Sequence, residues 1–143
     1  MIFFPVLVLH GILESSSDWV LASPKRSLGF MLADAGYDVW LGNMRGNTYG
    51  KRHCYKSPEN EDFWHFSVDH VGTYDIPAMI DRIRNVTGQD KIFFIGFSMG
   101  KSTKKLIKTK FLHLNYDIEY YRYNCLHDHG QSKTRISTIY TIG

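Results

Sequence analysis

The chain has 143 residues, 43% of them hydrophobic, and a formal net charge of +3 at pH 7. This length suits one globular domain, the apolar content excludes a largely disordered chain, and the small net charge gives no ground for nucleic-acid binding. The charge is uneven, because residues 1–100 contain nine Lys or Arg and eleven Asp or Glu, whereas residues 101–143 contain eight and three. We therefore predict two parts: residues 1–100, and a basic tail that begins after Gly100.

The first hundred residues are predicted to alternate between strands and helices. The predicted order is a strand at residues 5–10, a helix that begins at Ser23 and Pro24 and stops at Gly36, a strand at 38–42, a helix within 69–85 in which Pro77 causes a kink or a late start, and a strand at 91–97. The strands are continuous apolar runs, as expected when both faces of a parallel sheet are covered. The pattern therefore predicts an α/β fold with a parallel sheet.

A long loop from Asn47 to about Phe66 separates the second predicted strand from the second helix. It is rich in aromatic side chains, namely Tyr49, Tyr55, Phe63, Trp64 and Phe66. Loops of this length inside a compact domain are usually functional or packed on themselves. We therefore expect this loop to be ordered or to serve the function.

The third predicted strand runs directly into Gly96-Phe97-Ser98-Met99-Gly100, a G-x-S-x-G sequence. In this motif a strained backbone raises the serine hydroxyl above the end of the sheet, and the glycines let the strand and the next helix approach each other. Five residues alone are a weak signal, but their place after an apolar strand favours a nucleophile turn. We predict that Ser98 is a catalytic nucleophile and that the Met99 amide points toward the oxyanion.

A second oxyanion donor is expected in the loop after the first strand. The useful group there is a backbone N–H of Gly11-Ile12-Leu13, and we favour that of Ile12. His10 precedes this loop, but a hydrogen-bonded histidine packed at a strand end explains it at least as well as a catalytic role. We therefore do not assign His10 as the catalytic base.

Three stretches together resemble the acid lipases, the gastric and lysosomal group of the α/β-hydrolases. The stretches are VLHGILESSSDWV, GYDVWLGNMRGNTYGKRH and FWHFSVDHVGTYDIPAMIDRIRNVTGQDKIFFIGFSMG, in order within residues 5–100. The resemblance implies the N-terminal part of an α/β-hydrolase fold, incomplete at its C-terminal side, with Ser98 as nucleophile and the Ile12 and Met99 amides as the oxyanion hole. It also implies hydrolysis of triacylglycerols or cholesteryl esters without metal or cofactor, and a secreted or lysosomal location.

The chain departs from the family pattern at three positions within this region. Phe97 and Met99 stand where the family usually has His and Gln, although an oxyanion donor on the backbone does not depend on the Met99 side chain. His70 stands where the family usually has an acid in the preceding helix. This last substitution puts one local contact in question.

Residues 101–143 resemble no part of the family, in which later strands, a cap, and the acid and histidine of the triad follow the nucleophile. The tail offers His113, Asp117, His127, Asp128 and His129. We expect none of these histidines to reach Ser98, and LHDHG lacks the third ligand of a metal site. The basic run at residues 101–110 is expected to be a solvated segment, with an interfacial helix on anionic lipid as the alternative.

Other features of the sequence bear on compartment. Cys54 and Cys125 show no spacing signature, so we expect two free thiols. Asn85-Val86-Thr87 is an N-x-T sequon in an expected exposed turn, and the family resemblance makes glycosylation at Asn85 credible. The first residues show no signal peptide, and no transmembrane segment is expected.

The sequence thus predicts a lipase or ester hydrolase of the acid lipase type that meets neutral lipid at a lipid–water interface. Because the acid and histidine of the triad are not found in the region of resemblance, we expect a truncated and inactive form. The alternative is a non-catalytic lipid-binding protein that keeps the nucleophile turn. A third interpretation is an interaction module that acts through the basic tail.

Overall fold

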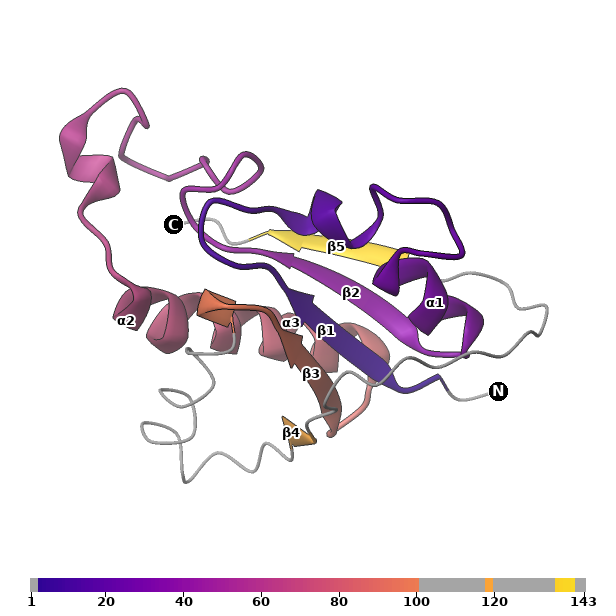
Figure 1. The fold of residues 1–143 in the computed structure, drawn as a ribbon. Coiled ribbons are helices and arrows are strands. Elements are labelled where there is room, and N and C mark those ends of the chain that lie inside the picture. Colours follow the sequence, from indigo (N-terminus) through magenta and orange to yellow (C-terminus); the bar gives the residue numbers. More distant parts are fainter. Residues whose placement is uncertain (1–2, 101–117, 120–135, 141–143) are drawn as a thin grey trace.

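The computed structural model describes residues 3–100, 118–119 and 136–140, and in these ranges five strands form one sheet with the order β4-β3-β1-β2-β5 (Figure 1). The strands are β1 (Pro5–Leu9), β2 (Asp38–Asn43), β3 (Ile92–Gly96), β4 (Ile118–Glu119) and β5 (Ile136–Tyr140). All four pairings are parallel. The predicted α/β class is confirmed, and the three strands expected in the first hundred residues are neighbours in one parallel sheet.

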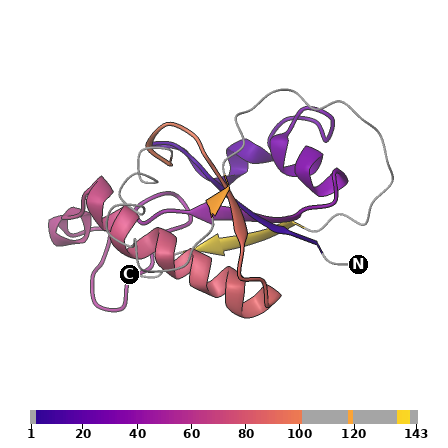
Figure 2. The same cartoon turned by 90° about the horizontal axis from the view of Figure 1, so that it is seen from below.

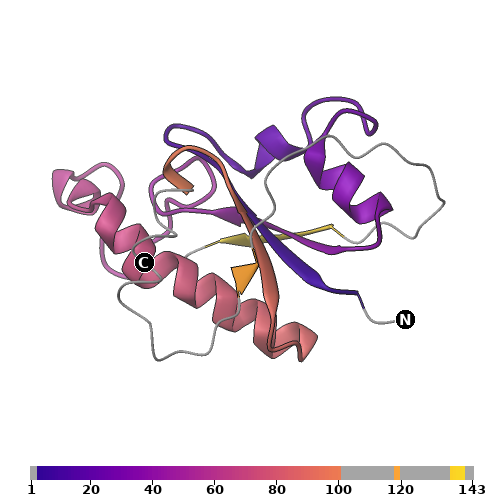
Figure 3. The same cartoon turned by 60° about the horizontal axis from the view of Figure 1, so that its bottom comes forward.

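Helices cover both faces of this sheet. The helix α1 (Leu28–Asp34) lies on one face and α3 (Ile76–Thr87) on the other (Figure 2, Figure 3). The shorter elements are the 3-10 helices η1 (Ser16–Trp19) and η2 (Glu61–Trp64), the single turn α2 (Val68–His70) and the π-helical segment η3 (Val71–Asp75). No helix among these described elements is both long and apolar enough to cross a membrane.

The central strand β1 supplies both layers of the core. Leu7 and Leu9 belong to the apolar cluster that includes α3, whereas Val6 and Val8 belong to the cluster that includes α1. All four side chains are buried. Since alternate residues of a strand point to opposite faces, a strand covered on both sides is apolar at every position, which explains the continuous run in the sequence.

The helix α1 begins later than the sequence predicted. Ser23 and Pro24 lie in an exposed stretch before the helix, and the first helical residue is Leu28, which follows Ser27. Most helical stability comes from packing an apolar face, and this face starts only at Leu28. The predicted stop is confirmed, because Gly36 has a φ of +89°, the left-handed conformation that suits a residue just after a helix.

A π-helical turn precedes Pro77, where the sequence predicted a kink or a late start of the helix. The helical segment runs on from Val68 to Thr87, but its hydrogen bonding changes in η3, where the Ile76 N–H donates to the Val71 carbonyl five residues earlier. Proline has no N–H to continue the α-helical pattern through this region. Within the wider turn, Asp75 is buried.

The long loop before α2 projects from the sheet and packs on itself (Figure 1). Its centre is the buried ring of Phe63, which meets the rings of Trp64 and Phe66 edge-on at centroid distances of 4.9 and 6.4 Å. Such edge-to-face contacts add to the gain from burial. Self-packing, one of the two expected explanations for the loop, therefore holds around Phe63, whereas Tyr55 is 95% exposed.

Both outer strands come from the segment after Gly100. β4 pairs with β3, and β5 pairs with β2, so they lie on opposite edges of the sheet. Ile139 of β5 is buried in the cluster on the α3 side, and Ile136 packs against the cluster on the α1 side. The division at Gly100, drawn from charge and resemblance, stays a prediction, and the sheet extends past it.

Candidate active site

Ser98 stands at a sharp turn between β3 and a helical turn that begins at Met99. Its φ is +48°, in the left-handed region that costs a residue with a side chain about 1–2 kcal/mol. The turn is held by the Phe97 N–H, which donates to the Leu9 carbonyl at 3.0 Å, and by the Gly100 N–H, which donates to the Phe97 carbonyl at 2.9 Å. The strained strand–turn–helix geometry predicted at Ser98 is present, and the serine is exposed.

Two glycines allow this turn to approach the end of β1. A Cβ at Gly100 would lie 2.8 Å from the Leu9 carbonyl oxygen and 2.9 Å from that of His10, distances that side chains do not tolerate against backbone. A Cβ at Gly11 would lie 3.1 Å from the Ser98 Cβ. The absence of side chains at these positions is therefore what brings Ser98 against the loop after β1.

The loop predicted to supply the second oxyanion donor is the one that Ser98 meets. Its Gly11 amide donates to Glu14 Oε2 at 2.6 Å. The amides of Ile12 and Leu13 have no hydrogen bond within the described residues. Leu13 has a φ of +62° and a fully exposed side chain, so this loop holds a second strained residue beside Ser98.

His10 is a buried imidazole with both ring nitrogens engaged. Its Nδ1 lies 2.7 Å from the Gly11 carbonyl oxygen, while its Nε2 accepts from the Met44 N–H at 3.2 Å and lies 2.9 Å from Asn47 Nδ2. An accepting Nε2 places the proton on Nδ1, which then donates to Gly11. Burial lowers the pKa of His10, against the opposing effects of the Gly11 carbonyl and nearby carboxylates. His10 is thus a neutral packed histidine, and it is not available as a base for Ser98.

Asn43 connects the loops that follow β1 and β2. Its Oδ1 accepts from the Ser16 N–H at 3.0 Å and from Asn47 Nδ2 at 2.7 Å, and its Nδ2 donates to Ser16 Oγ at 3.0 Å. The side chain is fully buried. Sequence reasoning did not single out Asn43, although a polar residue at the end of an apolar strand was the available signal.

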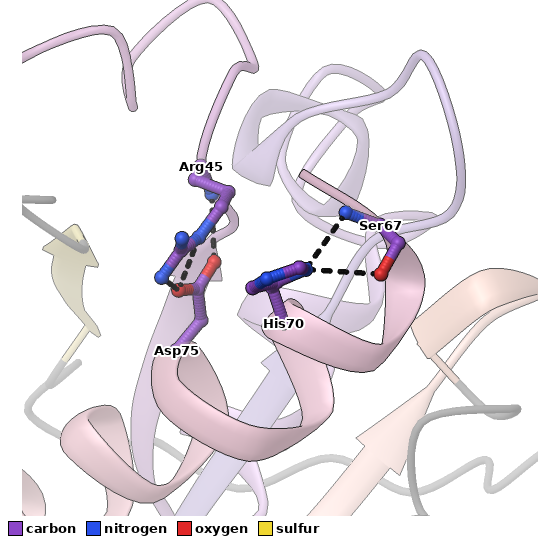
Figure 4. Close-up of polar contacts among 4 residues, drawn as sticks. All are labelled: Arg45, Ser67, His70 and Asp75. Atoms are coloured by element: carbon purple, nitrogen blue, oxygen red, sulfur yellow. Dashed lines mark hydrogen bonds and ion pairs between the residues drawn. The ribbon is translucent and has the colours of Figure 1, made fainter. Parts of the chain in front are cut away.

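An ion pair between Arg45 and Asp75 connects the loop after β2 to the π-helical turn η3 (Figure 4). The Asp75 carboxylate accepts from the Arg45 backbone N–H at 3.0 Å, from its Nε at 2.8 Å and from its Nη2 at 2.6 Å. The guanidinium also lies 5.9 Å from the centre of the Tyr74 ring. Nearby, His70 Nδ1 accepts from the Ser67 N–H at 3.1 Å, so His70 closes the first turn of α2.

In the described part of the chain, Ser98 lies against the loop that is predicted to supply an oxyanion donor, and the four described histidines make their contacts elsewhere. Within the described residues, His53, His65 and His70 each contact residues of their own loop or helix. Several predicted candidates lie outside the described residues: His113, Asp117, Cys125, His127, Asp128 and His129. Cys54 is exposed. In the same described ranges no three metal-ligating side chains come together.

The sequon asparagine lies in a helix rather than in the turn that the sequence predicted. Asn85 is exposed in the last turn of α3, because the helix continues to Thr87 and ends only at Gly88, whose φ is +67°. The Thr87 hydroxyl donates to the Ile83 carbonyl at 2.8 Å. Exposure at Asn85 agrees with expectation, and its glycosylation stays a prediction.

Comparison with known proteins points to one fold family. A family model described as alpha/beta hydrolase fold matches residues 5–100. Gastric triacylglycerol lipase of Bos taurus is 54% identical over 97 residues, which are 67% of this chain and 24% of that protein. Lipase lipl-3 of Caenorhabditis elegans is 49% identical over 98 residues, which are 68% and 24% of the two chains. Lipase member J of Homo sapiens is 50% identical over 95 residues, which are 66% and 26%.

The chain spans about a quarter of the length of these curated relatives. The similarity covers both halves of the site described above, since residues 5–100 include the loop after β1 and the turn at Ser98. The resemblance to gastric-type lipases within residues 5–100 is confirmed. This chain therefore belongs to the α/β-hydrolase fold family.

Proposed function

We propose that this chain carries the nucleophile and the oxyanion loop of a serine ester hydrolase of the lipase type. The observation that carries the proposal is the strained, exposed Ser98 set against Gly11 at the carboxyl end of β1. Ser98 Oγ would attack the ester carbonyl carbon, and the carbonyl oxygen would take up the negative charge beside the amides of Ile12 and Met99. The alcohol then leaves, and water releases the acid from the acyl-enzyme.

A neutral lipid ester, such as a triacylglycerol or a cholesteryl ester, is the proposed substrate class. Exposed apolar side chains flank the two segments that meet here: Ile12 and Leu13 follow Gly11 and are 61% and 100% exposed, and Phe97 precedes Ser98 and is 55% exposed. Exposed apolar side chains grouped beside one polar reactive group suit a ligand with long apolar chains. The relatives named as triacylglycerol lipases support the same class. A secreted or lysosomal location belongs to this proposal and is supported by the exposed Asn85 sequon.

We further propose that the chain turns over esters at a rate close to background. A general base has to come within about 2.6–3.2 Å of the hydroxyl proton donor, or slightly farther without substrate. Among the described histidines, His10 is fully engaged elsewhere, and the other three contact their own loop or helix. None of these four described histidines is therefore proposed as the base, and a serine hydroxyl depends on such a base for its nucleophilicity.

A second candidate function is lipid binding without turnover. The exposed group of Ile12, Leu13 and Phe97 supports it, because contact with lipid needs no base. Binding to phospholipid-coated triolein droplets distinguishes the two. A Leu13→Ser variant should bind less than the wild-type chain, and equal binding would count against a lipid-contacting role for this group.

Hydrolysis of p-nitrophenyl butyrate tests the proposed activity. The purified chain is compared with its Ser98→Ala variant and with Ser57→Ala, a control in the long loop. Equal rates in all three proteins would support turnover close to background. A rate that depends on Ser98 and disappears in His127→Ala or His129→Ala would contradict it and would place the base after residue 100.

A further inference from the structure

Glu14 places a carboxylate inside the oxyanion loop. Its Oε2 accepts from the Gly11 N–H at 2.6 Å. A Cβ built on Gly11 would lie 2.7 Å from this oxygen and 3.1 Å from the Ser98 Cβ. The separation of Glu14 Oε2 from the Ser98 Cβ is therefore at most the sum of these two distances. The side chain of Glu14 is half-buried, which limits the screening of its charge by water.

No cation balances this charge within the described residues. The ion pairs Arg45–Asp75 and Arg84–Asp90 and the contact between His65 and Glu61 do not include Glu14. The imidazole of His10 lies close enough for the charge of Glu14 to oppose the effect of burial on its pKa, but burial is the larger effect and lowers that pKa. With Nε2 accepting from Met44, His10 is neutral and offers no compensating charge.

We propose that Glu14 restrains the reactivity of Ser98, an inference that rests on the proposed role of Ser98 as nucleophile. Attack on an ester moves a negative charge onto the carbonyl oxygen, which has to lie beside the oxyanion donors. A carboxylate on the same loop repels that charge. Its hydrogen bond to the Gly11 amide holds the carboxylate next to the proposed donor amide of Ile12. Glu14 acts through the loop and through its charge, without contact with the reacting bond.

Variants of Glu14 separate the charge from the hydrogen bond. Glu14→Gln keeps an oxygen that can accept from Gly11 but removes the charge, whereas Glu14→Ala removes both. Glu59→Gln is the matched control, because Glu59 is an exposed glutamate in the long loop. The near-identical shape of glutamine keeps the loop packed, so a change of rate in Glu14→Gln reports the charge.

The rate is measured with a fluorophosphonate, in which the serine oxygen displaces fluoride from phosphorus, and the adduct is followed by intact-protein mass spectrometry. Glu14→Gln should react about tenfold faster than the wild-type chain, with Glu59→Gln unchanged. An equal or slower rate in Glu14→Gln, or no adduct in either protein, would overturn the restraint. If the wild-type chain and Glu14→Gln react at equal rates and Ser98→Ala forms no adduct, the restraint by Glu14 is wrong but Ser98 is still the nucleophile. If the adduct also forms in Ser98→Ala, the proposed role of Ser98 as nucleophile is wrong.

The Gly11 amide resonance gives a readout that needs no activity. A hydrogen bond to a carboxylate moves an amide proton downfield, so Glu14→Ala should shift the Gly11 signal upfield, and Glu14→Gln should shift it less. A Gly11 signal unchanged in Glu14→Ala would show that the contact does not form in solution and would overturn the inference.

Discussion

The ion pair between Arg45 and Asp75 predicts a large loss of stability when either partner is removed. The Asp75 carboxylate accepts three hydrogen bonds from Arg45 and is 1% exposed, whereas the Arg45 side chain is 24% exposed. The pair joins the loop after β2 to the π-helical turn that precedes α3 (Figure 4). Its loss therefore affects two segments that are distant in the sequence.

The size of the effect follows from burial. Removing one member of a buried ion pair costs about 3–5 kcal/mol, because the other charge stays in the interior without a partner. The partly exposed guanidinium of Arg45 recovers some hydration, so we expect Asp75→Asn to lower the free energy of unfolding by about 3 kcal/mol. Arg45→Met should cost at least as much, since it leaves the less exposed carboxylate unpaired. The double variant should cost less than the sum of the two single variants.

Urea unfolding of the four proteins measures these free energies. The exposed pair Arg84–Asp90 is the matched control, because its atoms are 3.4 Å apart and the Asp90 side chain is 94% exposed. Asp90→Asn should change the unfolding free energy by less than about 1 kcal/mol. If Asp75→Asn cost no more than Asp90→Asn, the argument from burial would be refuted.

Three further predictions concern single residues. Gly100→Ala should lower the free energy of unfolding by about 1–3 kcal/mol, because the added Cβ would meet backbone atoms. Gly36→Ala is the control and should cost about 1 kcal/mol in the same urea assay, because its Cβ would meet no atom but its φ is positive. Equal costs for the two variants would contradict the predicted backbone contact at Gly100. Because the pKa of His10 is lowered from 6.5 in the folded state, its contribution to stability is fully present above that pH and is lost as the pH falls toward the folded pKa. His10→Gln should remove a stability slope of at most about 1.4 kcal/mol per pH unit, measured by unfolding on both sides of that value, and an unchanged slope would argue against it. Expressed through a secretory route, the chain should gain glycosidase-sensitive mass that Asn85→Gln lacks, and identical mobility of the two would show that the site is unused.

Local patterns in the sequence predicted the elements correctly and their ends less well. The apolar runs identify β1, β2 and β3, because strands covered on both faces have no polar alternation. The start at Ser23 was wrong, since packing on the sheet begins only at Leu28. The helix α3 extended through Asn85, because Gly88 rather than the sequon ends it. Ends are decided by caps and by packing, which short patterns specify poorly.

The sequence by itself determined the α/β class and the strained turn at Ser98, since both follow from residue types within a few positions of each other. Tertiary structure alone decided what surrounds that turn. His10 bonds to Met44 and Asp75 to Arg45 across 34 and 30 positions of the chain. Glu14 lies only a few positions from Gly11, yet its proximity to Ser98 depends on β1 and β3 being neighbours. Strand order and register bring such groups together, and no local pattern of residues encodes those distances.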